Sequence, residues 1–317
     1  MATLLAAVLL AGLVGGCGLF DDVDLGVDGV RASWVTVEGQ NGRRVIVAWP
    51  AGHSNTDPRQ KLPVVIILHG LGSDAESMAR MAEWPTAVRD RDFVAVFADG
   101  YENSWNAGGC CGAAKDAGEN DVAFLDAIVD QVVAEQGVDP SRIYLTGYSN
   151  GAMMTYRYLC ERPDRLAGAA SVSGTDWSGC KQSAAVPFMQ VSGADDPVVP
   201  VKGGPSSMPG VGNVPKVETS VLGVALGAGC GPAKATTLGK VKVTRAEGCR
   251  NGATVRFDVV DGLDHSYPSG AVRPGYVAVD RILDFWGIAR KETAATSPAA
   301  AGGNATSTPS SPTTTVP

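Results

Sequence analysis

The chain has little positive charge and few histidines. Its 317 residues contain 26 Lys and Arg against 33 Asp and Glu, a formal net charge of −7. Phosphate binding needs a basic surface, so this balance argues against a nucleic-acid partner and against polyanionic substrates. Neutral or cationic small molecules are compatible with it. Only three histidines occur, His53, His69 and His265, which limits the candidates for a general base.

The cysteines lack the spacing of a metal site. Besides Cys17 there are six, Cys110, Cys111, Cys160, Cys180, Cys230 and Cys249. None belongs to a C-x-x-C pair or stands near a histidine, so we expect no metal site, and no cofactor is predicted. An even number of cysteines suits disulfides in an oxidising compartment. Cys230 and Cys249 flank a short segment before a predicted strand, and we expect them to pair.

Both ends of the chain lack features of a folded core. Residues 4–14 form an apolar run that is short for a membrane span, and Gly15-Gly16-Cys17 follows it. This arrangement is typical of an export signal, and its end resembles a bacterial lipobox with Cys17 as the site of a lipid anchor. No Lys or Arg precedes the run, which leaves open a start further upstream or a buried N-terminal helix. Residues 293–317 are almost entirely Ala, Gly, Ser, Thr and Pro, a composition typical of disorder.

We therefore expect a signal peptide over residues 1–17, one folded domain over 18–292 and a disordered tail over 293–317. The predicted location is extracellular or in the cell envelope, and the predicted state is a monomer. The even cysteine set supports export from the cytoplasm.

The folded part alternates predicted strands and helices. Apolar runs at 64–68, 93–98, 143–146, 188–191 and 253–260 are typical of buried strands. Runs at 34–37 and 44–48 are joined through Asn41-Gly42, a hairpin signal. Helical spacing over 122–132, with Asp121 as a candidate cap and Gly137 as a candidate end, predicts one helix, and residues 276–286 predict another. The alternation predicts an α/β fold with a mostly parallel sheet and helices on both faces.

The sharpest motif is Gly147-Tyr148-Ser149-Asn150-Gly151. It follows the 143–146 strand and precedes a predicted helix over 152–159. A strand-to-helix turn of this kind exposes a serine hydroxyl, and the small residues on either side let the backbones pass closely. The motif in this context predicts Ser149 as a nucleophile.

The base and acid should follow the nucleophile in the chain. His265 is the only histidine downstream of Ser149, so it is the candidate base. Asp195 and Asp196 follow the 188–191 strand, and either can supply the carboxylate that orients His265. His69, after the 64–68 strand, marks the loop that donates an oxyanion N–H. We predict the backbone N–H groups of Leu71 and Asn150 as the two donors.

These motifs resemble those of the polyhydroxybutyrate depolymerase-like and feruloyl esterase-like secreted esterases, carbohydrate esterase family 1, which have the α/β-hydrolase fold. The matching stretches are Leu68-His69-Gly70, Trp105-Asn106 with Cys110-Cys111, the segment 120–125, Arg142-Ile143-Tyr144 with the serine motif, the segment 193–200 and the segment 262–265. The resemblance implies that Asp196, rather than Asp195, is the acid. It also suggests Trp105 as a rim aromatic that binds substrate, with packing inside its own loop as the alternative. Tyr148 is the second candidate for substrate binding.

The chain departs from the family pattern at two places. Ser192 stands where the family usually has a histidine, and Leu263-Asp264 precedes His265 where glycines are common. We expect both changes to alter the pocket rim. Because only the tail follows the catalytic domain, we expect soluble esters, such as feruloylated sugars or short hydroxyacid oligomers. The alternatives are a serine peptidase on the same fold and a non-catalytic cell-surface binding protein.

Overall fold

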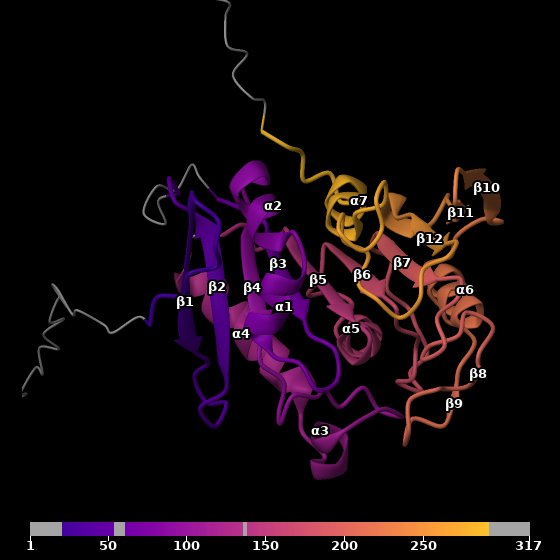
Figure 1. Ribbon diagram of the computed structural model, residues 1–317, viewed down its shortest axis with the longest axis horizontal. Coiled ribbons are helices and arrows are strands. Elements are labelled where there is room, and N and C mark those ends of the chain that lie inside the picture. The colour runs from indigo at the N-terminus through magenta and orange to yellow at the C-terminus, as the bar shows by residue number, and fades with distance from the viewer. Residues whose placement is uncertain (1–20, 54–60, 136–137, 292–317) are drawn as a thin grey trace, which may run out of the picture.

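The computed structural model describes residues 21–53, 61–135 and 138–291. Its main feature is a ten-stranded sheet in the order β1-β2-β4-β3-β5-β6-β7-β12-β11-β10 (Figure 1). The strands are β1 Val30–Thr36, β2 Arg44–Pro50, β3 Val64–Leu68, β4 Val94–Ala98, β5 Ile143–Tyr148, β6 Gly168–Val172, β7 Phe188–Gly193, β10 Lys234–Leu238, β11 Val241–Ala246 and β12 Val255–Val260. A separate pair is formed by β8 Gly204–Pro205 and β9 Asn213–Val214.

The central strands are parallel and the outer ones antiparallel. β4, β3, β5, β6, β7 and β12 run in one direction. β2 and β11 run against their neighbours, and β1 and β10 close the two ends by antiparallel pairing. Every residue of β3 and β4 is buried, as expected of strands covered on both faces.

Helices cover both faces of the sheet and divide the interior into two cores. The helices are α1 Ala75–Met81, α2 Trp84–Arg91, α3 Ala113–Ala117, α4 Asp121–Glu135, α5 Asn150–Glu161, α6 Val217–Gly227 and α7 Ala278–Phe285, with a short 3-10 turn at Arg250–Gly252. Side chains of α4, α5 and α6 pack in one core. Those of α1, α2 and α7 pack in the other, on the opposite face of the sheet (Figure 1).

The predicted α/β-hydrolase fold is confirmed, and so is the hairpin signal. Asn41 and Gly42 both have positive φ values, 53° and 78°, in the turn between β1 and β2. The prediction that Asp121 caps its helix is wrong. The helix begins at Asp121 itself, so Asn120 is at the cap position, and its Oδ1 accepts a hydrogen bond from the Ala123 amide. The Asp121 carboxylate forms an ion pair of 2.7 Å with Arg43. The strands β6, β8, β9, β10 and β11 and the helices α1, α2, α3 and α6 were not predicted from the sequence.

Several predictions concern parts of the chain outside the described residues. They are the signal peptide, the lipid anchor at Cys17, the end of the helix at Gly137 and the disordered tail. None of the helices in the described ranges combines the length and the apolar character needed to cross a membrane.

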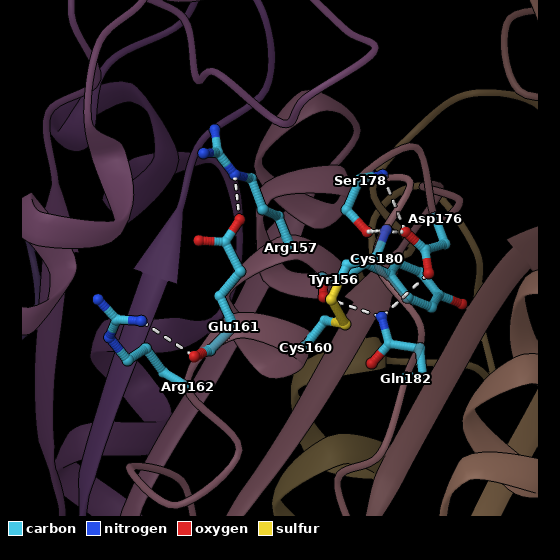
Figure 2. The surroundings of a disulfide bond; sticks show 9 residues. All are labelled: Tyr156, Arg157, Cys160, Glu161, Arg162, Asp176, Ser178, Cys180 and Gln182. Atoms are coloured by element: carbon cyan, nitrogen blue, oxygen red, sulfur yellow. Dashed lines mark hydrogen bonds and ion pairs between the residues drawn. A yellow bond between two sulfur atoms is a disulfide. The ribbon is translucent and has the colours of Figure 1, made fainter.

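Three disulfides join the six remaining cysteines. The predicted Cys230–Cys249 pair is confirmed, and Cys110–Cys111 and Cys160–Cys180 are the other two. Cys160 lies in the last turn of α5, so its bond to Cys180 ties that helix to the segment after β6. Figure 2 shows the polar groups around this bond, where the Asp176 carboxylate accepts hydrogen bonds from Ser178 and Gln182. These contacts fix the segment that packs beside α5.

Candidate active site

Ser149 occupies the turn between β5 and α5. Its backbone has φ 53° and ψ −116°, a conformation that non-glycine residues rarely adopt. From β3 the chain continues to β4 on one side of the sheet and then to β5 on the other side of β3. The turn at Ser149 lies at this switch point. Ligands of open α/β sheets bind at this kind of position, outside the carboxyl ends of the strands.

The two glycines of the motif permit this turn by their lack of a side chain. A Cβ atom on Gly147 would lie 2.3 Å from backbone atoms of Gly151. A Cβ atom on Gly151 would lie 2.4 Å from the carbonyl oxygen of His69. Real Cβ atoms do not approach so closely, so only glycine allows β3, β5 and α5 to converge around Ser149.

The structure brings Ser149, His265 and Asp196 into one hydrogen-bonded chain. His265 Nε2 lies 2.9 Å from Ser149 Oγ, and His265 Nδ1 lies 2.7 Å from Asp196 Oδ2. A carboxylate only accepts hydrogen bonds, so Nδ1 carries the proton in this arrangement and Nε2 is left to accept the serine proton. Ser149 and Asp196 are buried, and the His265 side chain is 15% exposed.

Asp196 is fixed by its own loop. Its Oδ1 atom accepts hydrogen bonds of 2.8 Å from the amides of Val198 and Val199, which leaves Oδ2 for the histidine. The neighbouring Asp195 is exposed. Asp264 is also exposed, and its carboxylate accepts from the Ser266 amide at 3.0 Å. Of the carboxylates of Asp195, Asp196 and Asp264, only that of Asp196 forms a hydrogen bond with the His265 ring.

Tyr148 holds the backbone that carries His265. Its hydroxyl donates to the His265 carbonyl oxygen, and its ring lies 5.5 Å from the imidazole between centroids. Burial raises the pKa of Tyr148 well above the usual value, with the nearby Asp196 adding to the effect, so the hydroxyl remains a donor. Sequence reasoning placed Tyr148 in substrate binding and missed this contact, because nothing in the motif indicates a partner more than a hundred residues away.

His69 orients the loop that follows β3. Its buried imidazole donates from Nδ1 to the Gly70 carbonyl oxygen at 2.8 Å and accepts at Nε2 from the Gly100 amide at 2.9 Å. Burial lowers the pKa of His69, which favours this neutral form. The peptide unit is planar and trans, so a Gly70 carbonyl that faces the imidazole turns the Leu71 N–H the opposite way.

Neither of the two predicted oxyanion donors has a backbone acceptor among the described residues. In the described part of the chain, the Leu71 amide donates no backbone hydrogen bond. The Asn150 amide is at the first position of α5, where helix geometry provides no acceptor. The Asn150 side chain is occupied, because Oδ1 accepts from the Trp105 amide at 2.7 Å and Nδ2 donates to the Trp105 carbonyl at 2.9 Å.

Two residues expected at the pocket rim lie inside the protein. Trp105 is fully buried: its indole N–H donates to the His69 carbonyl at 3.0 Å, and its ring stacks on Phe124. The expectation that Trp105 contacts substrate does not fit this placement, because packing and hydrogen bonding consume both its ring and its N–H. Ser192 is 1% exposed and accepts from Gln190 Nε2 at 2.9 Å, so it also does not form the rim.

The sheet order, the two helical layers and the turn at Ser149 define an α/β-hydrolase. The chain belongs to the phospholipase/carboxylesterase family, which it matches over residues 53–213. It is therefore a carboxylic ester hydrolase.

Known proteins of related sequence and structure are named as esterases. NocK of Nocardia uniformis subsp. tsuyamanensis, named an esterase, is 29% identical over 243 residues, 70% of this chain and 71% of that protein. Feruloyl esterase B of Piromyces equi is 27% identical over 72% of this chain, which spans only 43% of that relative. The acetyl xylan esterase of Aspergillus awamori shares the fold, with a TM-score of 0.57 at 15% identity over 81% of this chain and 99% of that one. The predicted resemblance to feruloyl esterase-like proteins is confirmed. The resemblance to polyhydroxybutyrate depolymerase-like proteins stays a prediction.

Proposed function

We propose that the protein cleaves carboxylic esters through an acyl-enzyme on Ser149. In the first half-reaction His265 Nε2 accepts the hydroxyl proton while Ser149 Oγ attacks the ester carbonyl. The tetrahedral intermediate collapses, the alkoxy group leaves with the proton from His265, and the acyl group stays on Oγ. In the second half-reaction His265 Nε2 accepts a proton from a water molecule, and the water oxygen attacks the acyl carbonyl. The bond to Ser149 Oγ then breaks, His265 returns the proton to Oγ, and the carboxylic acid is released.

The remaining residues stabilise charge that develops during these steps. Asp196 stabilises the imidazolium form of His265 and keeps its ring in register. The amides of Leu71 and Asn150 donate to the oxyanion, and the N-terminal end of α5 adds a positive dipole end there. His69 and Tyr148 act as positioning residues, the first on the Leu71 amide and the second on the backbone of His265.

The observation that carries the proposal is the pair of hydrogen-bond distances around His265. The 2.9 Å contact to Ser149 and the 2.7 Å contact to Asp196 are those of a base poised between a nucleophile and an orienting acid. His265 lies within hydrogen-bond distance of the Ser149 hydroxyl and can accept its proton. This contact supports nucleophilic catalysis over the alternative of a non-catalytic binding protein.

For the substrate, we infer feruloyl or other plant cell-wall-type esters, or short hydroxyalkanoate esters. Relatives named feruloyl esterase and an acetyl xylan esterase of the same fold support the first class. The second class rests on the sequence resemblance alone. A location outside the cytoplasm is supported by the three disulfides, which persist in oxidising compartments.

The test compares the wild-type chain with Ser149→Ala on methyl ferulate, hydroxybutyrate oligomers, nitrophenyl acyl esters of graded length and aminoacyl amides. We expect ester turnover in the wild type and a loss of roughly a million-fold in kcat in the variant. A fluorophosphonate probe should label the wild type and leave the variant unlabelled. Unchanged ester turnover by Ser149→Ala would refute the mechanism, and faster cleavage of amides than of esters would favour the peptidase alternative.

A further inference from the structure

The end of the sheet formed by β12, β11 and β10 reaches beyond the helices that cover the centre (Figure 1). Every residue of β10 is exposed. On this part of the sheet a cavity of about 390 Å³ opens between the turn of the β10–β11 hairpin, the strand β12 and the segment that leads into α7. None of the residues that line it belongs to the proposed catalytic machinery.

Four cationic side chains line this cavity, which we call the cationic pocket. Lys240 comes from the hairpin turn, Arg256 from β12, Arg273 from the segment before α7 and Arg281 from α7 itself. No aspartate or glutamate lines it. A concentration of positive charge is unexpected in a chain with a net charge of −7.

Only one of the four cations is neutralised by an acid. Arg256 contacts Asp258 through two hydrogen bonds of 2.7 and 2.6 Å, and Asp258 also accepts from the Tyr276 hydroxyl at 2.8 Å. Both carboxylate oxygens of the buried Asp258 therefore already accept hydrogen bonds from Arg256 or Tyr276. The two acids of α7, Asp280 and Asp284, both pair with Arg91, and Asp280 also pairs with Arg290.

The other three cations have no carboxylate partner in the described ranges. Arg273 donates only to the Asp261 backbone carbonyl, and Arg281 lies 5.6 Å from the centroid of the Tyr276 ring. The ion pairs of the surrounding described residues join Lys216 to Glu218, Arg245 to Glu247 and Arg256 to Asp258, and none of them includes Lys240. Three like charges around one cavity repel each other, and an anion bound between them would remove that repulsion.

We propose that the cationic pocket binds a small organic carboxylate at a site separate from Ser149. The carboxylate group faces Lys240, Arg273 and Arg281, whose N–H groups form charge-assisted hydrogen bonds with it. The apolar body lies along Leu238, Val241 and Pro274, which are the accessible apolar residues of the lining. Val243 and Val260 lie beneath them and are buried.

The size and lining of the pocket favour an organic anion over an inorganic one. A volume of about 390 Å³ falls in the range of pockets for small organic ligands. It exceeds the roughly 30 Å³ share of one water molecule about tenfold, so a lone phosphate or chloride would leave the apolar wall in contact with water. An aromatic or branched monocarboxylate such as cinnamate would cover this wall and meet the cations at one end.

The experiment measures binding of cinnamate to the full-length chain by isothermal titration calorimetry. We expect saturable binding, weakened roughly tenfold by Lys240→Gln and again by Arg281→Gln, the effect of losing one charge-assisted hydrogen bond each. Both side chains are exposed, so the variants should fold, and thermal melting followed by circular dichroism checks this. The matched control is Lys234→Gln, which removes an exposed lysine of β10 outside the pocket and should leave the affinity unchanged.

Two further ligands test the chemistry. Cinnamamide has the same body without the charge and should not bind measurably, and inorganic phosphate should bind far more weakly than cinnamate. Cinnamate affinity that is the same in all variants would place the ligand elsewhere, for example at Ser149, and overturn the proposal. Equal affinity for cinnamamide or for phosphate would overturn it as well. The measurement needs no turnover, so its outcome is independent of the proposed catalytic function.

Discussion

At the scale of single residues, burial and hydrogen bonding distinguish side chains that look alike in the sequence. Asp195 and Asp196 are adjacent and chemically identical, but Asp195 is exposed and Asp196 is 4% exposed. Asp196 also accepts two backbone amides and the His265 imidazole. The chain order of the motifs could not separate the two aspartates, because this difference arises from how the loop after β7 folds.

The pair of aspartates provides a matched test of the proposed acid. We expect Asp196→Asn to lower kcat by about 10⁴, because an amide at this position favours the wrong tautomer of His265. Asp195→Asn removes the same charge one residue away and should keep kcat within about twofold of the wild type, since an exposed side chain without a contact to His265 has little influence on it. Steady-state kinetics on a nitrophenyl ester measures both, and equal losses in the two variants would contradict the assignment.

His69 is expected to make stability depend on pH. Burial lowers its pKa below the ordinary value of 6.5, so below about pH 6.5 the unfolded chain binds a proton that the folded chain does not. The stability gained from the neutral imidazole is therefore present above pH 6.5 and is lost as the pH falls toward the folded-state pKa. Urea unfolding at pH 7.5 and pH 5.5 should show a smaller pH-dependent loss in His69→Gln, which cannot titrate. His53 and His265 are common to both proteins, so equal losses would contradict the prediction.

At the scale of elements, strands with a strong apolar pattern could be predicted and weakly patterned elements could not. The runs at β3 and β4 are entirely apolar, and β5 and β7 begin with the apolar residues Ile-Tyr-Leu and Phe-Met, so the positions of these strands follow from composition. β6 has the sequence Gly-Ala-Ala-Ser-Val, whose small residues have low strand propensity, and only its place between β5 and β7 makes it a strand. The helix α6 contains Gly223, which weakened its pattern.

The same reasoning explains which part of the candidate site was predictable. Ser149 and His265 follow from motif and chain order, which are properties of the sequence. The contacts of Tyr148 with His265 and of His69 with Gly70 depend on segments that meet only after the sheet has formed. The family resemblance suggested Trp105 as a rim residue, but its ring is buried and stacks on Phe124.

Two glycines in different surroundings should respond in opposite ways to substitution by alanine. Gly151 lies where β3, β5 and α5 approach closely, and Gly223 lies in open space on α6. Gly151→Ala places a Cβ atom 2.4 Å from the His69 carbonyl, and we expect a loss of about 1–3 kcal/mol in the free energy of unfolding together with at least about tenfold lower kcat. Gly223→Ala, in the middle of α6, has open space around the new methyl group. Because alanine is the better helix former, this variant should gain up to about 1 kcal/mol and keep its activity. Urea unfolding and ester turnover measure both, and a stable, active Gly151→Ala would contradict the account of the turn.

At the scale of the whole molecule, charge is distributed unevenly. The net charge of −7 makes the average surface potential negative, while the cationic pocket at one end of the sheet is a local exception. The field of the whole protein acts over the Debye length, about 30 Å at 0.01 M salt and about 3 Å at 1 M. At low salt an approaching substrate therefore experiences the net charge, and at high salt only the groups it touches.

This charge distribution predicts how ionic strength changes the choice among esters. Three nitrophenyl esters with acyl chains of equal length, ending in a cationic, a neutral or an anionic group, should differ in kcat/KM at 10 mM salt in that order, by up to about tenfold between the extremes. Raising the salt to 1 M should lower kcat/KM for the cationic ester, raise it for the anionic one and leave the neutral one nearly unchanged, because screening removes the long-range field but not the contacts at Ser149. The neutral ester is the control for salt effects on the chemical step. A preference for the anionic ester at 10 mM salt would show that positive groups near the entrance, rather than the net charge, govern the approach of substrate.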